Sequence, residues 1–139
     1  MAEEPSPTAV RQVIFDTDVL VWYLRGRESA RRFILRVPAP ARTVSALTMM
    51  ELIQGCRNGA EVGEVYGFMR DDIARLVHRD EAASHRAIGL LERHAAAHGL
   101  RVVDALIAAA ALQVGAVLAT ANVRHYRVVD GLLLLAFRP

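Results

Sequence analysis

The chain has 139 residues, about the length of one domain. Apolar residues make up 53% of it and charged residues 23%, a composition that excludes an intrinsically disordered chain. The formal net charge is only +2, but all 17 basic residues are arginine, which excludes chemistry that needs a lysine, such as a Schiff base or a P-loop.

The N-terminal residues 1–9 are expected to form a flexible leader rather than a secretory signal, because they are acidic and proline-rich and lack an apolar core. The longest apolar runs, 105–112 and 132–137, are too short to span a bilayer. The single cysteine, Cys56, cannot form an internal disulfide. We therefore expect a cytoplasmic protein with no membrane partner, in which residues 10–139 form one domain.

Hydrophobic periodicity, turn residues and helix caps predict short strands that alternate with helices. In chain order we expect a strand over 13–15, helices over 19–24 and 28–37, a strand over 42–46, helices over 48–54 and 60–70, a strand over 73–77, helices over 80–98 and 105–114, a strand over 116–119, a helical turn over 122–126 and a strand over 132–135. This alternation predicts an α/β fold with a parallel sheet and helices on both of its faces.

Two of the expected helices carry patterns that indicate how they pack. In the helix over 80–98, Ile88, Leu91 and Ala95 have the spacing of one apolar face. The helix over 105–114 is rich in alanine and almost wholly apolar, which predicts burial on most of its sides.

Basic residues are concentrated between Arg25 and Arg42, where six arginines and one acid, Glu28, give a local charge of 6 − 1 = +5. Such a segment is suited to bind phosphates or an acidic partner. A solvated helix face explains it equally well, so charge alone does not decide between the two.

Polar residues that follow the expected strands are the first candidates for a functional site. In parallel sheets with helices on both faces, ligands bind outside the carboxyl ends of the strands. Asp16 directly follows the first expected strand, and Thr120 and Asn122 follow the fourth. We expect these side chains to share one edge of the sheet.

Four segments place a carboxylate or amide beside apolar residues, and each has an ordinary structural explanation. Asp, Asn, Ser or Thr before a helix is a common N-cap, and Thr followed three residues later by Glu forms a capping box. On this explanation the N-caps are Asp16 or Asp18, Asp104 and Asn122, and the capping box consists of Thr48 and Glu51.

Taken together, these carboxylates are explained less well by capping. Glu51 and Asp104 both stand between apolar neighbours, and a buried carboxylate must be paired, protonated or bound to a metal ion. No arginine is adjacent to Glu51 or within two residues of Asp104 in the sequence. Converging carboxylates would repel one another unless a divalent cation joined them, and ligands that are all oxygen suit Mg²⁺ or Mn²⁺.

The residues around these carboxylates resemble the motifs of a known family. The segments 13–20 (VIFDTDVL), 45–55 (SALTMMELIQG), 99–109 (GLRVVDALIAA) and 118–126 (LATANVRHY) are similar, in this order, to motifs of PIN-domain ribonucleases of the VapC type, the toxins of toxin–antitoxin pairs. The resemblance covers the chain from residue 13 to residue 135. It implies a PIN fold, in which helices flank a five-stranded, mainly parallel sheet.

The resemblance also implies roles for individual residues. Asp16, Glu51 and Asp104 would be the catalytic acids and, with Asn122, would hold Mg²⁺ or Mn²⁺. The fourth position is often aspartate in this family, but many VapC-like members have asparagine there, so Asn122 implies a pocket of lower negative charge and not a loss of activity. Hydrogen bonds from Thr17 and Thr120 would orient the carboxylates or bound water.

The activity implied by the resemblance is endonucleolytic hydrolysis of RNA, with tRNA or rRNA as plausible substrates. The phosphate contacts would come from the arginine-rich segment. His125 and Tyr126 would either contact a base or have a packing or capping role, and the sequence does not decide between these two. A VapB-like antitoxin would cover the site, held in part by the apolar residues 21–24, and the chain would form a homodimer. The arginines expected to contact RNA are Arg25, Arg27, Arg31 and Arg32.

Three alternatives stay open at this point. A phosphatase of the haloacid dehalogenase type would use Asp16 as a nucleophile, although Leu20 departs from its motif and the lysine that it usually needs is missing. A degenerate PIN domain would bind its antitoxin or RNA without catalysis, which Asn122 favours. A third site would use His94 and His98, which share one helix face but have no recognisable third ligand.

Overall fold

Five short parallel strands form one sheet in the computed structural model, which describes residues 11–139. The leader expected over 1–9 lies outside these residues. Every neighbouring pair of strands is parallel, so the expected α/β sheet is confirmed. The strands are β1 (Val13–Phe15), β2 (Arg42–Ser45), β3 (Arg75–Val77), β4 (Val117–Thr120) and β5 (Leu133–Ala136), and their order across the sheet is β3-β2-β1-β4-β5.

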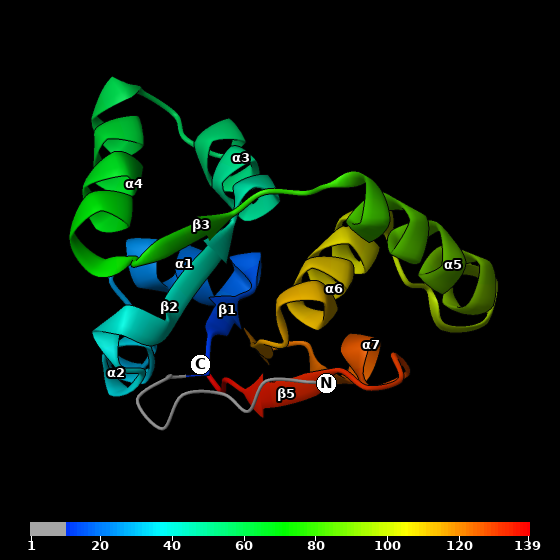
Figure 1. Cartoon of the computed structure of the whole chain (residues 1–139). Helices are drawn as coiled ribbons and strands as arrows, with labels where there is room; N and C mark the ends of the chain where they lie inside the picture. The colour runs from blue at the N-terminus through cyan, green and yellow to red at the C-terminus, as the bar shows by residue number, and fades with distance from the viewer. Residues whose placement is uncertain (1–10) are drawn as a thin grey trace.

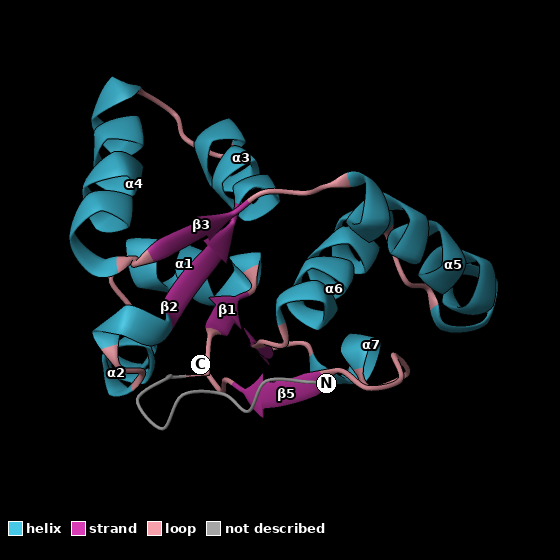
Figure 2. Ribbon diagram, viewed as in Figure 1, coloured by secondary structure: helices cyan, strands magenta, loops and turns pink. Residues whose placement is uncertain are grey.

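Helices cover the sheet on two sides (Figure 1). Helices α5 and α6 lie together on one side, and α2, α3 and α4 lie on the other, with the strands between them (Figure 2). None of the helices over residues 11–139 is long and apolar enough to cross a membrane. The helices are α1 (Thr17–Leu24), α2 (Glu28–Arg36), α3 (Ala46–Gln54), α4 (Gly59–Asp72), α5 (Glu81–His98), α6 (Val102–Val114) and α7 (Val123–Tyr126), with a single 3₁₀ turn at Ala39–Ala41.

Each face of the sheet has its own hydrophobic core, because successive side chains of a strand point to opposite faces. Ile14 and Leu118 pack with α5 and α6, whereas Phe15 and Ala119 pack with the helices of the other side. All four side chains are completely buried. The central strands β1 and β4 are thus held on both faces, which fixes the positions of the residues at their carboxyl ends.

The packing of α5 differs from the expected one. Of the expected face, Leu91 packs against the core, but Ile88 is 55% exposed and Ala95 is also exposed. The buried residues of α5 are Ala83, Ala87 and Leu90. This face packs against α6, which is buried over most of its length, as expected from its alanine-rich sequence. Small side chains on both helices allow the backbones to approach closely, so close packing of alanines outweighs the larger apolar area of Ile88.

Several helices begin earlier than expected, and this changes the explanation of the polar residues. Asp16 is the N-cap of α1, but the N-cap of α3 is Ser45, so Thr48 lies inside that helix and its expected capping box is wrong. Helix α6 begins at Val102, which places Asp104 in its first turn rather than at its N-cap. Asn122 occupies the N-cap position of α7, but its side chain makes no capping hydrogen bond.

Candidate functional site

The candidate site lies at the carboxyl ends of β1 and β4, where the strand order reverses. From β1 the chain builds outward through β2 to β3, and on the other side of β1 it adds β4 and β5. A reversal of this kind leaves a crevice at the carboxyl edge of the sheet, where ligands bind. Asp16 directly follows β1 and Thr120 ends β4, so the topology brings together residues that are 104 positions apart.

Asp16 is held rigidly at this edge. Its backbone N–H donates to the carbonyl oxygen of Ala119 across 2.8 Å. One carboxylate oxygen, Oδ1, accepts a hydrogen bond of 2.9 Å from the amide of Thr17, and the other, Oδ2, accepts one of 2.8 Å from the hydroxyl of Thr120. The residue is only 7% exposed, so its carboxylate is the most deeply buried acid of the site.

The electrostatic environment of Asp16 is unfavourable for a bare carboxylate. The pKa of Asp16 is raised to about 7, mainly by burial, with further contributions from the negative charge of Asp18 and, to a smaller extent, of Asp104. Hydrogen bonds from Thr120 and from the Thr17 amide lower the pKa but do not offset the burial. The site therefore concentrates negative charge in a place with little water.

Glu51 reaches the site from α3 through Thr17. The hydroxyl of Thr17 donates to Glu51 Oε1 across 2.7 Å and lies 3.1 Å from the hydroxyl of Thr48. Thr17 thus links Glu51 to the backbone that carries Asp16. Glu51 is half-buried, whereas the apolar residues beside it in the sequence suggested full burial.

Asp104 enters the site from the first turn of α6. The backbone N–H of Arg101 donates to its Oδ2 across 3.2 Å, and the hydroxyl of Tyr126 donates to its Oδ1 across 3.3 Å. His125 Nδ1 lies 3.6 Å from Oδ2. Asp104 is half-buried, whereas its apolar sequence neighbours suggested full burial.

Tyr126 lies in the core behind the site. The sequence left two roles open for it. The side chain is completely buried, so the packing role is confirmed and the base contact is wrong. Burial raises the pKa of its hydroxyl well above the usual value, and the charges of Asp16 and Asp104 raise it further. Only a general rule could have indicated this contact from the sequence: a buried tyrosine hydroxyl needs a hydrogen-bond partner, and here the partner is the carboxylate of Asp104.

Asn122 stands apart from the other expected ligands. It is exposed, and its contact with the site is through the backbone, where its N–H donates to the hydroxyl of Thr120 across 2.9 Å. Asp18, by contrast, accepts a 3.1 Å hydrogen bond from the amide of Ala121, in the same loop. Of Asp18 and Asn122, Asp18 is therefore the residue whose side chain contacts the site.

The donor atoms of the site fit a hard divalent cation. Asp16, Glu51 and Asp104 offer only oxygen, and none of them forms an ion pair with an arginine over residues 11–139. In this same range no three His, Cys, Asp or Glu side chains are already close enough to enclose an ion, which also leaves His94 and His98 without a third ligand. Mg²⁺ commonly uses one or two carboxylates and keeps several waters, which suits an open arrangement.

The four arginines expected to contact RNA lie between α1 and α2 or on α2, in different surroundings. Arg25 lines a cavity of about 710 Å³ together with Glu51, and Arg57, which sequence reasoning did not single out, lines it as well. Arg25 and Arg27 also lie 6.0 and 5.0 Å from the ring centre of Trp22. Only Arg25 among the predicted four therefore shares a cavity with a site acid.

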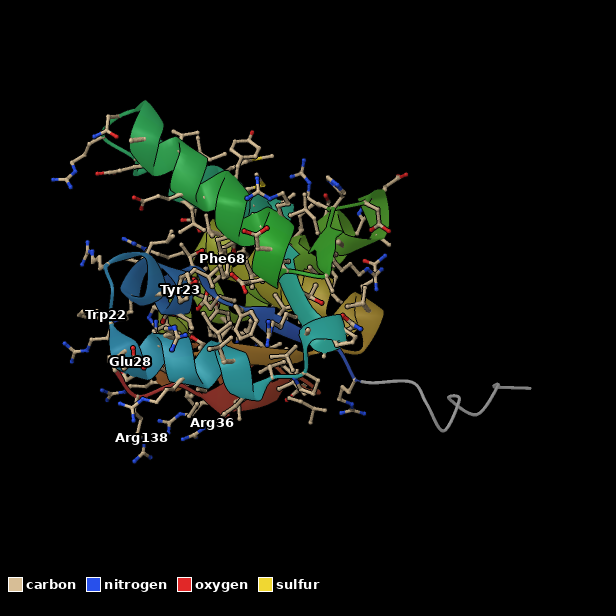
Figure 3. The ribbon with its side chains drawn as sticks, turned by 90° about the vertical axis from the view of Figure 1, so that its left-hand side faces the viewer. Trp22, Tyr23, Glu28, Arg36, Phe68 and Arg138 are labelled. Carbon is tan, nitrogen blue, oxygen red and sulfur yellow. The ribbon has the colours of Figure 1, made fainter. Side chains whose placement is uncertain are left out.

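The other two arginines lie on the exposed face of α2. Arg31 and Arg32 lie 3.5 and 3.9 Å from Glu28 of the same helix. Arg27 and Arg31 border a second cavity, of about 410 Å³, whose apolar wall includes Tyr23 and Phe68. The rings of these two residues are 4.7 Å apart and join α1 to α4 (Figure 3).

Comparisons with known proteins place the sequence among its relatives. The model of the PIN domain family matches residues 13–131. A curated relative, "Ribonuclease VapC19" of Mycobacterium tuberculosis, is 34% identical over 118 residues, which cover 81% of this chain and 90% of the relative.

Solved structures share the fold at lower sequence identity. A toxin–antitoxin complex from Klebsiella pneumoniae has a TM-score of 0.75 at 20% identity and covers 91% of this chain and 98% of its own. DNA-bound VapBC from Salmonella typhimurium has a TM-score of 0.72 at 21% identity, covering 93% and 100%. FitAcB from Neisseria gonorrhoeae has a TM-score of 0.70 at 21% identity, covering 89% and 96%.

Proposed function

The chain belongs to the PIN-domain family, among its VapC-type members, and we propose that it is an endoribonuclease that depends on Mg²⁺ or Mn²⁺ and acts as the toxin of a toxin–antitoxin pair. The observation that carries this proposal is that three acids around the strand-order reversal are each held by a hydroxyl, Asp16 by Thr120, Glu51 by Thr17 and Asp104 by Tyr126, and that none of them pairs with an arginine over residues 11–139. A ribonuclease is also what the curated relative is named.

Asp16, Glu51 and Asp104 are the residues that would hold the ion and serve as the catalytic acids. The chemistry that a divalent ion supplies in such a site is activation of water and neutralisation of the charge that develops on a phosphate. The proposed reaction is hydrolysis of an RNA phosphodiester bond: the oxygen of water bonds to phosphorus, the bond to the 3′ oxygen breaks, and a 5′-phosphate is left on the product.

The surrounding side chains would keep the acids in their reactive orientation. The hydroxyl of Thr120 and the amide of Thr17 fix both oxygens of Asp16, and the hydroxyl of Thr17 fixes Glu51. Tyr126 holds Asp104 from the buried side of the pocket. Such supporting hydrogen bonds orient ligands and raise the affinity for a metal ion.

RNA would reach this pocket along its basic border. Arg25 and Arg57 line the cavity that Glu51 also lines, so their charges can contact phosphates on either side of the bond that is cleaved. His125 is half-buried beside Asp104, where a base contact is compatible with its position. Arg27, Arg31 and Arg32 lie on the neighbouring corner and would act on a longer RNA.

The partner that we propose is a VapB-like antitoxin, because the similar solved structures include toxin–antitoxin complexes. Its segment would lie in the cavity between α1 and α4, where Tyr23 and Phe68 offer an apolar wall and Arg27 and Arg31 can pair with acids. We also propose that the chain forms a homodimer and is located in the cytoplasm. Light scattering of the purified chain would test the dimer.

The function is tested by RNA cleavage on a pool of tRNA and rRNA, with and without Mg²⁺ or Mn²⁺, after removal of any partner that copurifies. Asp104→Asn is the informative variant. Asp130→Asn is its matched control, because this exposed carboxylate precedes β5 at the amino end of the sheet, opposite the pocket.

We expect the wild type and Asp130→Asn to cut in a metal-dependent way, and Asp104→Asn to lose at least about 100-fold in rate. Equal cutting by Asp104→Asn would show that the activity arises elsewhere or from a contaminant. No cutting by the wild type on any RNA, combined with tight binding of antitoxin, would favour the degenerate PIN domain instead.

A further inference from the structure

We propose that Asp18, rather than Asn122, supplies the fourth oxygen-bearing side chain of the metal pocket. Asp18 in α1 would thus provide the carboxylate that the loop after β4, with Asn122, does not have. The inference rests on the proposed function of the pocket and adds a residue to it. It follows from where the two side chains lie and from how their polar atoms are paired.

The carboxylate of Asp18 is drawn to the loop after β4. Its Oδ2 accepts a hydrogen bond of 3.1 Å from the amide of Ala121 and lies 3.4 Å from the hydroxyl of Thr120. That hydroxyl is closer to Asp16, at 2.8 Å, and it has a single proton to donate. Asp18 Oδ2 is therefore left with one good donor, a backbone amide, and competes with Asp16 for the second.

The other oxygen of Asp18, Oδ1, lacks a hydrogen-bond partner in the described part of the chain. Oδ1 is buried and accepts no hydrogen bond from any of the described residues, 11–139. A buried carboxylate oxygen without a donor is costly, because the water that would solvate it has been removed. Something outside the chain is needed to satisfy this atom, and the options are water or a cation.

The charges around Asp18 favour a cation. Asp16 stands two residues away in the sequence, and Asp104 lies within electrostatic range of Asp18, so three acidic side chains share this part of the pocket. No arginine over residues 11–139 pairs with Asp18. One divalent ion would neutralise the charges that Asp16, Asp18 and Asp104 share.

Asn122 does not fill this role in the structure. It is exposed, its side chain does not cap α7, and its backbone N–H is what contacts the site. The hydrogen bond from Ala121 instead ties Asp18 to the residue that immediately precedes Asn122. The carboxylate of Asp18 is thus held beside the loop after β4, in the place where a metal ligand from that loop would be needed.

A purely structural role for Asp18 makes a different prediction. Its position in the first turn of α1 is favourable for an acid, because the N-terminus of a helix attracts negative charge. If Asp18 only stabilised α1 and fastened the loop, its removal would destabilise the ion-free protein. If it is a ligand with an unsatisfied buried oxygen, its removal would leave the ion-free protein at least as stable.

The test is calorimetric titration of the ion-free full chain with Mn²⁺, together with urea unfolding in EDTA. We expect Asp18→Asn to weaken Mn²⁺ binding at least about tenfold, and Asn122→Ala to change it less than about threefold. Asp18→Asn keeps an oxygen that can accept from the Ala121 amide and removes only the charge, whereas Asp18→Ser removes the carboxylate and shortens the side chain; both should show the same loss of binding. Asp130→Asn is the neutral control, and Asp16→Asn is the variant that should lose binding altogether.

The outcomes separate this inference from the proposed function. Wild-type affinity in both Asp18 variants, or an equal loss in Asn122→Ala, would overturn the role of Asp18 while leaving the pocket intact, provided that Asp16→Asn still abolishes binding. A marked loss of stability of both Asp18 variants in EDTA would also overturn it, in favour of the structural role. Absence of Mn²⁺ binding by the wild type would overturn both proposals.

Discussion

The hydroxyl of Tyr126 lies 3.3 Å from Asp104 Oδ1, although the tyrosine ring is completely buried in the core between the sheet and α6. A core residue therefore holds a carboxylate of the proposed active site from behind. The aromatic ring fills the core, and the hydroxyl supplies the one hydrogen bond that a phenylalanine would not.

Replacing Tyr126 by Phe should weaken the pocket without disrupting the core. The ring keeps its volume, but Asp104 loses a donor, so we expect a loss of about tenfold in metal affinity and in cleavage rate. Tyr66→Phe is the matched control, since Tyr66 is 55% exposed on α4. Equal Mn²⁺ affinities of the two variants would contradict this role.

The link between Thr17 and Glu51 gives a second prediction. Thr17→Val keeps the branched shape but removes the 2.7 Å hydrogen bond to Glu51, whereas Thr17→Ser keeps the hydroxyl. We expect Thr17→Val to cleave RNA about tenfold more slowly at saturating substrate, and Thr17→Ser to stay within about threefold of the wild type. A similar rate for both variants would mean that the hydroxyl does not orient Glu51.

The stability of the ion-free chain should depend on pH through Asp16. Its pKa is about 7 in the folded chain against an ordinary value of 3.8, so the folded state binds the proton more tightly. Stability is therefore favoured at low pH and is lost as the pH rises from about 4 to about 7, by up to about 4 kcal/mol.

Asp16→Asn removes this titration. In EDTA, its free energy of unfolding relative to that of the wild type should increase steadily between pH 4 and pH 7. Urea unfolding at several pH values measures the difference. A difference that stays constant across this range would show that Asp16 does not carry the raised pKa.

Arg25 and Arg32 should differ in their effect on RNA binding. Arg25 borders the cavity that contains Glu51, whereas Arg32 lies on the exposed face of α2 beside Glu28. Arg25→Ala should raise the KM for RNA several-fold with little change in kcat. It should also reduce the slope of log affinity against log salt concentration by about 1, the amount expected for the loss of one phosphate contact. Arg32→Ala should have a smaller effect. Equal effects would mean that the arginine corner acts as one diffuse patch.

The arrangement of strands and helices follows from local patterns in the sequence. The short apolar run Val13–Phe15 ends at Asp16, and the alanine-rich helix ends at Gly115, whose φ of 66° suits glycine. Because such signals act within a few residues, they predict the existence and order of the elements and hence the parallel sheet. They also predict that Asp16 and Thr120 meet at its carboxyl edge.

The packing of the polar residues is decided by tertiary structure alone. Nothing near Tyr126 in the sequence indicates that its hydroxyl meets Asp104, which is 22 positions away. Likewise, only the pairing of β1 with β4 brings Asp18 to the amide of Ala121. Local sequence determines which side chains stand at the ends of strands and helices. The order of the strands and the depth of burial decide which of these side chains face one another. Strand order and burial depend on contacts between distant segments, so local sequence does not reveal them.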